Sequence, residues 1–580
     1  MAERAKIDAT AGMSPRPTYA GAPTTDSPAA TTTTLLSVSD AVLNLALGYL
    51  DSDTLAVCQS CCRVLGWAAQ SDDLWRVKCA EDWGEKRKVC PHQRSPLVLV
   101  PTYLEAWRAW RRAFHGYHAP DVKRVGMWWA GVEAWMSEHL PEVVQTLNVG
   151  VTEEDLDRAE TMLGWPLPVH LRLLYRFHNG QWLPWGERLN ESVGVDEGRP
   201  AVPPEVAGSG MSLGLLGGYC FYNHMTTSKL FSLQRGVVAG LVTANAMDGE
   251  SGAYFEACAV RWGTDLDTVR SRGGFLLAAG HDMRKRAWVG KDGNVRFDGK
   301  QGSLMGVFSA APVPATAPSS SSSSHASTDS SSGSGAGGGD AASAAAAAGA
   351  GGRHHREGNL MMWLEEYLRR LQGGWYGVKA RWREPMRAAG EAVPRVHHLR
   401  GVWLYPREGG DGCVTDVTNQ GVQIQGSPVF VPEECSDRSV TDLMWTYTIR
   451  MKLLGDHPSR PPAMSSCQLS TRHWEIDGPR GFHREVSGDG VIGQYPQLSV
   501  AEPAAAAAGG FPGDPCVFEY ESCTTLESTP GEPVQANCCD VAGTMGGHFS
   551  FTPGSLDSPR GAAFNARVPT FDLKDPTFIF

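Results

Sequence analysis

Apolar and polar residues recur with two different periods along this chain. From Asp40 to Leu50 the apolar residues return every three or four positions, which is typical of an amphipathic helix. From Cys467 to Ile476 apolar and polar residues alternate, which predicts a half-buried strand. Short apolar runs such as "GFLLAAG" lie among helical segments between these extremes. The pattern therefore predicts a multidomain chain: a small all-α part, a mixed α/β part and an all-β module.

The first helical stretch has more apolar surface than it can cover by itself. Acidic or hydroxyl residues at Ser39, Asp51 and Ser71 are suited to cap three short helices. Burying a Leu or Val side chain contributes about 1.5–3 kcal/mol, so an apolar face left in water is unfavourable. We therefore expect this face to bind a downstream domain or a separate protein. An ordinary helical bundle with these leucines as its core is the alternative.

This stretch resembles an F-box, a family defined by an apolar helix ending in Tyr-Leu, an Asp, a second helix and Leu-Trp. Tyr49-Leu50, Asp51 and Leu74-Trp75 occupy the corresponding places. Two departures are Ser39, where Pro is usual, and Ala46, where a larger aliphatic residue is common. The resemblance implies binding of a Skp-type adaptor. The residues expected to contact it are Val42, Leu45, Leu47, Leu50, Leu55 and Trp75.

Residues 100–178 continue with helical patterns. Trp107 and Trp110 lie three positions apart and are expected in a core. Thr152, followed by three acids, predicts a helix start, because acids are favourable at the positive end of the helix dipole. His178 could act as a base, but we expect no nucleophile or acidic orienting residue to accompany it, so we interpret it as a structural histidine.

The segment "LGWPLPVHLRLLYRFHNGQ" resembles the opening of a SUKH-type domain. "GLLGGYCFYN", "AYFEACAVRWG", "GFLLAAG" and "AWVGKDGNVRF" fit its mixed sheet, and residues 359–376 resemble its closing helix. The Ser/Ala/Gly-rich tract at 317–352 then becomes an insertion within this domain. The resemblance implies a protein-binding module without shared catalytic residues.

A G-x-G-x-x-G string, Gly488, Gly490 and Gly493, raises the question of a dinucleotide site. Such a fingerprint requires a helix directly after the glycines, because the helix N-terminus holds the pyrophosphate. Here "QYPQL" follows, with Pro496 in what would be the first turn, and more alternating strands come after it. A dehydrogenase is therefore excluded.

The glycines lie instead among segments that resemble ApaG domains, which are fibronectin-type-III-like sandwiches. These segments are "YTIRM", "CQLSTRHWEI", "GDGVIGQYP", "FEYESCTTLES" and "GTMGGHFSF". The resemblance implies that Gly488, Gly490 and Gly493 line a cleft that binds a client protein. Tight turns without a ligand are the alternative. Insertions at 502–515 and after Gly531 depart from the family pattern.

Charge and composition exclude several other classes. The net charge of −11 opposes general nucleic-acid binding, since the phosphate backbone attracts basic surfaces. No apolar run is long enough to span a bilayer, and the first ten residues do not resemble a secretory signal. Among the 14 cysteines, Cys58, Cys61 and Cys62 lack a second pair that would complete a zinc site. We expect reduced thiols, no metal, no cofactor and no catalytic residues.

The expected organisation is a disordered tail (1–34), an F-box (35–85), a helical connector (86–124), a SUKH-like domain (125–378, with the insertion 310–357) and an ApaG domain (393–580). This order resembles the three-domain F-box family, whose members include plant proteins. It implies a non-catalytic substrate receptor of a Skp–cullin–F-box ubiquitin ligase, with a Skp-type adaptor, a cullin–RING core and a client as partners. A cytoplasmic or nuclear location follows. A scaffold without ligase function and a phosphate or nucleotide sensor remain alternatives.

Overall fold

The structure is a computed structural model. It describes residues 38–91, 98–182, 213–221, 224–239, 274–280, 285–298, 304–307, 360–383, 397–405, 414–417, 420–431, 442–478, 481–500, 517–527, 541–574 and 578–580. The predicted tail, both low-complexity insertions and the segment "AYFEACAVRWG" lie outside the described residues. The chain divides into two compact units, Met1–Lys78 and Cys79–Phe580.

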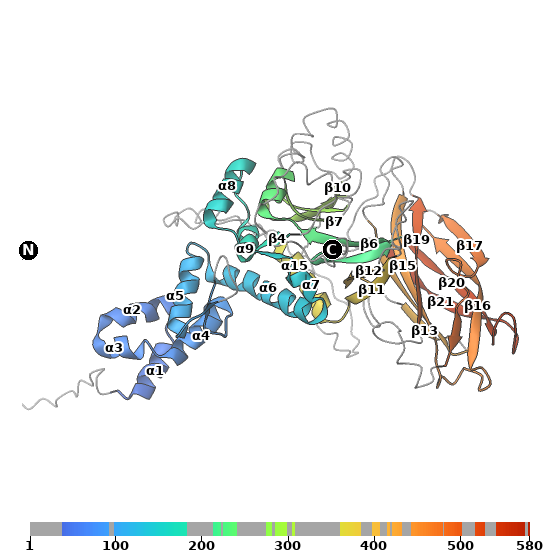
Figure 1. Cartoon of the computed structure of the whole chain (residues 1–580), viewed down its shortest axis with the longest axis horizontal. Coiled ribbons are helices and arrows are strands. Elements are labelled where there is room, and N and C mark those ends of the chain that lie inside the picture. Colours follow the sequence, from blue (N-terminus) through green and yellow to red (C-terminus); the bar gives the residue numbers. More distant parts are fainter. Residues whose placement is uncertain are drawn as a thin grey trace, which may run out of the picture. The chain divides into compact units, whose positions relative to one another are not determined.

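The first unit, which we call the helical unit, is formed by short helices drawn in blue in Figure 1. They are α1 (Asp40–Gly48), α2 (Ser52–Cys61), α3 (Arg63–Ala68) and the start of α4 (Asp72–Trp83). Asp51 caps α2 as predicted, because its carboxylate accepts the backbone N–H of Thr54 at 2.8 Å. Helix α3 was not predicted: Gly66 interrupts its apolar pattern. A Cβ at this glycine would lie 2.8 Å from the Gln59 carbonyl oxygen, so the glycine permits close packing against α2.

The second unit begins with a mixed region of helices and sheets. Its helices include α5 (Tyr103–Ala113), α6 (Ala119–His139), α7 (Pro141–Val144), α8 (Glu153–Leu163), α9 (Val169–Phe177) and α15 (Leu360–Gln372). The predicted start of α8 is confirmed, since Thr152 and Asp155 form a reciprocal capping box. Trp107 and Trp110 are buried, as expected of core residues.

An eight-stranded sheet runs through this mixed region in the order β10-β9-β8-β7-β6-β5-β12-β11. The strands are β5 (Leu216–Phe221), β6 (His224–Leu230), β7 (Phe275–Gly280), β8 (Arg286–Val289), β9 (Val295–Asp298), β10 (Leu304–Val307), β11 (Gly377–Arg383) and β12 (His397–Trp403). Two small antiparallel strand pairs accompany it, β1 (Val89–Cys90) with β2 (Val98–Leu99) and β3 (Leu147–Val149) with β4 (His178–Gln181). Strand β12 pairs with β11 and β5, so residues 397–403 belong to this sheet and not to the β-sandwich that follows.

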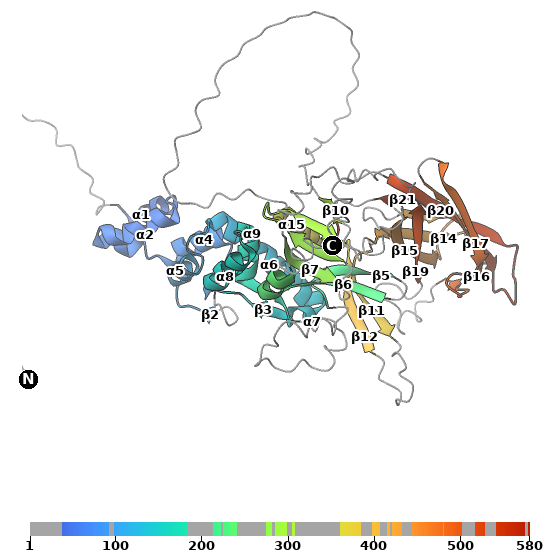
Figure 2. The ribbon, with the colours of Figure 1, turned by 90° about the horizontal axis from the view of Figure 1, so that it is seen from above.

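Helices α6 and α15, which are more than 200 residues apart in sequence, lie side by side in Figures 1 and 2. The Trp128 indole N–H donates to the Leu364 carbonyl oxygen at 2.7 Å. The Arg124 guanidinium binds both carboxylate oxygens of Glu365, at 2.6 and 2.7 Å. A charge-assisted pair of this bidentate geometry fixes direction as well as distance. Helix α15 therefore belongs to the mixed region, although the low-complexity tract separates it in sequence from the earlier elements of that region.

The all-β C-terminal domain consists of two antiparallel sheets, drawn in orange and red in Figure 1. One has the order β13-β14-β15-β19; the other has β17-β16-β20-β21, with β18 beside β16. The strands are β13 (Val414–Val417), β14 (Val422–Phe430), β15 (Asp442–Leu453), β16 (Ser466–Asp477), β17 (His483–Asp489), β18 (Gln497–Ser499), β19 (Phe518–Glu527), β20 (Val541–Pro553) and β21 (Phe564–Lys574). The predicted strand from Cys467 to Ile476 is thus confirmed as β16.

Aromatic side chains fill the space between these two sheets. Tyr447 of one sheet contacts Trp474 of the other edge to face, with ring centroids 5.6 Å apart. Phe549 packs on Trp474 in the same manner at 5.4 Å. Offset and edge-to-face pairs of this kind add about 0.5–1.5 kcal/mol each beyond area burial. The β-sandwich, as we name it, therefore has a core of its own.

Lys229 on β6 is fully buried in the mixed region, and desolvation lowers its pKa to about 7. The ordinary lysine pKa is about 10.4, so between pH 7 and 10 the unfolded chain holds a proton that the folded chain lacks. Stability therefore rises with pH across this window. We expect Lys229→Met to flatten this rise, because methionine has no group that titrates. Urea unfolding at pH 7 and pH 9 measures the slope; an unchanged slope contradicts the assignment.

Within the described residues, no helix is long and apolar enough to cross a membrane.

Candidate functional site

Helix α1 carries apolar residues on two opposite sides. Leu43 and Leu47 are buried in the helical unit. Val42 and Leu45 face outward and are 55 % and 63 % exposed. Tyr49 follows one turn later and is also exposed. Since residues three and four apart share a helix face, these three form one stripe in water.

The structure divides the six residues predicted to bind an adaptor. Val42 and Leu45 are exposed and available to a partner. Leu50 is half-buried. Leu47, Leu55 and Trp75 are buried in the chain itself, and the Trp75 indole N–H donates to the Ala69 carbonyl oxygen at 2.6 Å. These last three therefore hold the unit together and do not offer a surface in this structure.

Further exposed apolar residues lie on neighbouring helices of the same unit. Val57 on α2 and Trp67 on α3 are more than half exposed. Together with Val42, Leu45 and Tyr49 they make up what we call the apolar face. Exposed apolar residues gathered on one small unit are typical of interaction sites in soluble proteins. Sequence reasoning missed Tyr49, Val57 and Trp67, although the spacing of positions 42, 45 and 49 signalled the stripe.

The three glycines predicted to line a cleft lie at one end of the β-sandwich and shape its backbone. Gly488 lies on β17, where a Cβ would be 3.1–3.2 Å from the Arg472 guanidinium. Gly490 has φ +59, and a Cβ there would lie 2.5 Å from the Gln494 carbonyl oxygen. Gly493 has φ +75 with open space around it. Gly488 thus leaves space for the Arg472 guanidinium, whereas Gly490 and Gly493 allow the backbone to adopt left-handed conformations.

Residues 494–500, which follow these glycines directly, contain no helix, so the string is not a dinucleotide fingerprint. The Gly490 amide donates to the Ser470 carbonyl oxygen at 2.8 Å. Val491 and Gln494 exchange two backbone hydrogen bonds, at 2.9 and 2.8 Å. The Arg472 guanidinium donates to the Gly490 carbonyl oxygen at 2.8 Å. These three amides and one nitrogen of Arg472 are thus already used within the loop.

The tip of this loop carries a strained apolar residue. Ile492 and Gly493 are the two central residues of a two-residue hairpin, with φ of +44 and +75, which corresponds to a type I′ turn. Ile492 is the sole non-glycine residue with positive φ in the part of the chain that the structure describes. A β-branched residue is strongly disfavoured there, yet its side chain is 54 % exposed. Strain that carries no packing benefit points to a functional role.

Two further exposed apolar residues, Tyr495 and Leu556, lie on loops that the Gln468 side chain connects. The Gln468 side chain donates to the Tyr495 carbonyl oxygen at 2.9 Å and accepts the Leu556 amide at 2.8 Å, so it links both loops. Tyr495 and Leu556 are both exposed. We call Ile492, Tyr495 and Leu556 the tip patch. No other large apolar residues of the β-sandwich are exposed among those the structure describes.

We expect Ile492→Asn to stabilise the β-sandwich by about 1 kcal/mol, because Asn adopts positive φ far more readily than Ile. Denaturant unfolding measures the change, and Tyr495→Asn, which relieves no backbone strain, is the matched control. A loss of stability in Ile492→Asn would show that its side chain packs in the fold.

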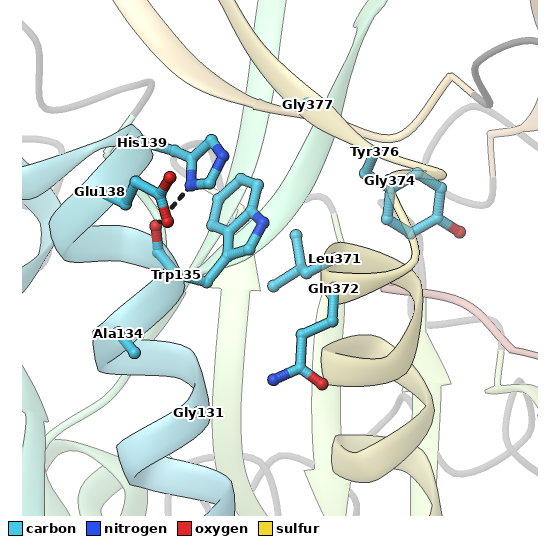
Figure 3. Close-up of a pocket in the computed structure, with 10 residues that line it drawn as sticks. All are labelled: Gly131, Ala134, Trp135, Glu138, His139, Leu371, Gln372, Gly374, Tyr376 and Gly377. Atoms are coloured by element: carbon cyan, nitrogen blue, oxygen red, sulfur yellow. Dashed lines mark hydrogen bonds between the residues drawn. The ribbon is translucent and has the colours of Figure 1, made fainter.

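A pocket of about 380 Å³ lies between α6 and α15 in the mixed region (Figure 3). Trp135, Leu371 and Tyr376 are its buried apolar walls. Glu138 and Gln372 are exposed at its rim. The lining contains no Ser, Thr or Cys that could serve as a nucleophile. Its polar groups are therefore limited to Glu138, His139, Gln372, the Tyr376 hydroxyl and the Trp135 indole N–H.

The electrostatic character of this pocket favours a donor or a cation. The His139 ring stacks on Trp135 at 4.4 Å, and its Nδ1–H donates to the Trp135 carbonyl oxygen at 2.9 Å. That tautomer leaves Nε2 of the neutral ring as an acceptor. Glu138 is the sole lining residue of full charge, and Figure 3 shows its carboxylate beside His139.

The expectation that no acid accompanies His178 is wrong. The Glu133 carboxylate lies 2.8 Å from His178 Nε2, and the Asn148 carbonyl oxygen lies 3.1 Å from Nδ1. Glu133 comes from α6, 45 residues earlier, so sequence proximity did not reveal it. The ring also packs on Trp129 at 4.5 Å. Both ring nitrogens and one face of His178 are thus engaged within the fold, and its interpretation as a structural residue stays a prediction.

Metal-binding chemistry finds no support among the described residues. No group of three His, Cys, Asp or Glu side chains there converges to hold an ion. Cys58, Cys61 and Cys62 are free thiols, and burial raises the pKa of the Cys58 thiol. Cys538 and Cys539 lie outside the described residues.

The fold and these surfaces define a multidomain protein with an all-β domain at its C-terminal end, helical and mixed regions before it, and exposed surfaces suited to binding proteins. Comparison with known proteins identifies this domain: residues 433–553 match the family model of the ApaG domain. The Protein ApaG of Bradyrhizobium diazoefficiens is 33% identical over 161 residues, which covers 28% of this chain and 92% of that protein. The chain therefore belongs to the ApaG family through this domain.

Similarity to other proteins extends over nearly the whole chain. F-box protein SKIP16 of Arabidopsis thaliana is 28% identical over 554 residues, covering 94% of this chain and 100% of that protein. F-box only protein 3 of Homo sapiens is 23% identical over 550 residues, covering 94% of this chain and 84% of that protein. The predicted resemblance to F-box proteins with a C-terminal ApaG domain is thus confirmed.

Proposed function

We propose that this chain is a substrate receptor of a Skp–cullin–F-box ubiquitin ligase. The apolar face of the helical unit is the observation that carries the proposal, since Val42 and Leu45 are exposed on one side of α1. Its supporting context is the similarity, over 94% of the chain, to proteins named as F-box proteins. The apolar face binds a Skp-type adaptor, which in turn recruits a cullin and a RING subunit.

The three buried residues of the predicted adaptor site support the proposed binding of a Skp-type adaptor indirectly. Leu47, Leu55 and Trp75 fix the helices from within, so the outward residues keep their arrangement without a partner. Preorganised binding surfaces lose less conformational entropy on association. Ser39 caps α1 with its backbone alone, since its side chain makes no capping hydrogen bond. The replacement of the usual Pro therefore leaves the helix start intact.

Client binding is the task of the mixed region, a SUKH-like domain in this proposal, and of the ApaG β-sandwich. The tip patch supports a protein client, because it is apolar, exposed and presented by a strained hairpin. The chain itself performs no chemistry. It raises the effective concentration of client lysines near the charged conjugating enzyme, and tethering of this kind reaches the millimolar range.

Two measurements test the proposal. A Skp-type adaptor should co-purify with the full chain from a cell lysate, and its absence would sink the ligase role in favour of a scaffold. Ile492→Asn should reduce capture of client proteins while Skp binding stays unchanged. Client capture is read by proximity labelling, with Tyr495→Asn expected to act in the same direction. Labelling patterns identical to the parent in both variants would remove the tip patch from the client site.

The phosphate-sensor alternative lacks a supporting observation in the loop, where the amides of Gly490, Val491 and Gln494 donate to carbonyl oxygens. Calorimetric titration of the full chain with pyrophosphate and with ATP should give no heat of binding. A saturable signal that Arg472→Gln abolishes would reverse this conclusion.

A further inference from the structure

Residues Phe578–Phe580 lie in a seat built from the mixed region. Phe580 is 3 % exposed, and Ile579 is buried as well. The Trp363 indole N–H donates to the Ile579 carbonyl oxygen at 2.7 Å. The Lys285 ammonium donates to the Phe580 carbonyl oxygen, also at 2.7 Å. Two buried donors thus hold the backbone of a three-residue segment from another part of the chain.

The two phenylalanine rings enter this seat side by side. Their planes are parallel within 1°, with centroids 6.2 Å apart, as expected of positions i and i+2 of an extended segment. Phe580 stacks on Trp363 at 5.8 Å and lies 5.1 Å from the Tyr367 ring. The Arg370 guanidinium lies over both phenylalanine rings, at 5.7 Å from Phe578 and 5.4 Å from Phe580. Arginine over an aromatic face is an attractive arrangement within about 6 Å.

The seat residues are fixed by contacts of their own. Arg370 is held by Glu366 at 2.5 Å and by the Tyr376 hydroxyl at 2.7 Å. Lys285 is 1 % exposed, and its ammonium lies 4.8 Å from the centre of the Tyr219 ring. A buried ammonium demands acceptors, because an ion removed from water without them is costly. The seat is therefore a formed site that selects a ligand with carbonyl oxygens between aromatic rings.

We propose that this seat is a recognition site for peptide segments of aromatic–aliphatic–aromatic sequence, and that Phe578–Phe580 of the same chain fills it as a resident ligand. Trp363 and Lys285 bind the backbone oxygens of the segment, and Arg370 contacts its two aromatic rings. The site does not depend on the role in ubiquitin transfer. A protein that presents the same pattern in extended form competes with the resident segment.

Tyr376 connects the seat of Phe578–Phe580 with the neighbouring pocket between α6 and α15. Tyr376 lines the pocket of Figure 3, and its ring centroid lies 6.5 Å from that of Phe580. Its hydroxyl accepts a hydrogen bond from the Arg370 guanidinium at 2.7 Å. Exchange of the resident segment therefore alters the support of one pocket wall.

Binding of a labelled peptide tests the proposal. A fluorescein-labelled hexapeptide of residues 575–580, Asp-Pro-Thr-Phe-Ile-Phe, is titrated against the intact chain and against a variant that lacks residues 578–580. The variant should bind at least tenfold more tightly, since in the intact chain the tethered segment competes at high effective concentration. Peptide with Phe580→Ala should bind at least fivefold more weakly. Equal affinity of the intact chain and the variant would overturn the proposal, as would no binding to a folded variant.

Two arginines on α15 provide a matched control. Arg369 pairs with the same Glu366 carboxylate, and its guanidinium lies over Trp375. In the deletion variant, Arg370→Gln should weaken peptide binding at least fivefold, whereas Arg369→Gln should leave it unchanged. If deletion prevents folding, Phe580→Ala in the full chain replaces it and should bind the peptide at least fivefold more tightly than the parent. Equal binding by that variant and the parent would also refute the seat.

Discussion

Leu45→Asp is expected to abolish co-purification of a Skp-type adaptor while the chain stays folded. Leu45 is exposed on the apolar face, so an acid there costs little in the free protein. In a complex the same carboxylate would be buried without a partner, which is strongly unfavourable. Truncation or charging of a central interface residue typically costs 2–4 kcal/mol, which corresponds to a loss in affinity of about thirty- to a thousandfold.

Two further variants serve as controls, one for the added surface charge and one for unfolding. Met162→Asp places the same charge at an exposed apolar position on α8 and should not affect adaptor binding. Leu47→Asp introduces the charge inside the helical unit and should unfold it, since Leu47 is buried. Circular dichroism separates the two causes of lost binding. Undiminished binding by folded Leu45→Asp would refute the apolar face as the adaptor site.

Gly490→Val is expected to destabilise the β-sandwich by about 3–5 kcal/mol, which is in the range of severe single mutations. The residue has φ +59, which a β-branched side chain does not tolerate, and its Cβ would lie 2.5 Å from the Gln494 carbonyl oxygen. That oxygen accepts the Val491 amide in the hairpin, so relief of the clash breaks the turn. Urea unfolding with tryptophan fluorescence follows the loss, because Trp474 lies in the sandwich core.

Gly493→Asn is the control for this prediction. Its φ of +75 is compatible with Asn, and a Cβ there meets open space, so the stability should change by less than about 1 kcal/mol. A mild effect of Gly490→Val would show that the loop relaxes. If Gly490→Val destabilises the β-sandwich as expected, its loss of client capture reports on the fold and not on a partner contact. Ile492→Asn is the sharper probe of binding.

Elements defined by local patterns were predictable. The strand from Cys467 to Ile476, the cap at Asp51 and the capping box at Thr152 depend on residues within a few positions of each other. The tryptophans at 107 and 110 were placed correctly in a core, because a helix period assigns them to one face.

Contacts between distant segments were not predictable from one sequence. Glu133 reaches His178 from a different helix, and β12 joins a sheet whose parallel partner lies about 180 residues earlier. The six adaptor residues share one pattern, yet three are buried, because packing decides which side of a short helix faces inward. The positive φ of Ile492 was also not predictable, because the glycine spacing around it does not indicate which residue of the turn adopts that backbone conformation.

The pairing of α6 with α15 has a consequence for the order in which the chain folds. Trp128 and Arg124 cannot form their hydrogen bonds until Leu364 and Glu365 have been synthesised, more than 230 residues later. Contacts of such sequence separation form late and slowly, because loop closure precedes any gain. Until residue 372 has emerged, the apolar side of α6 lacks its cover and is exposed to chaperones and to aggregation. Expression of fragments that end within the low-complexity tract should therefore yield insoluble protein, whereas fragments that keep α15 should not.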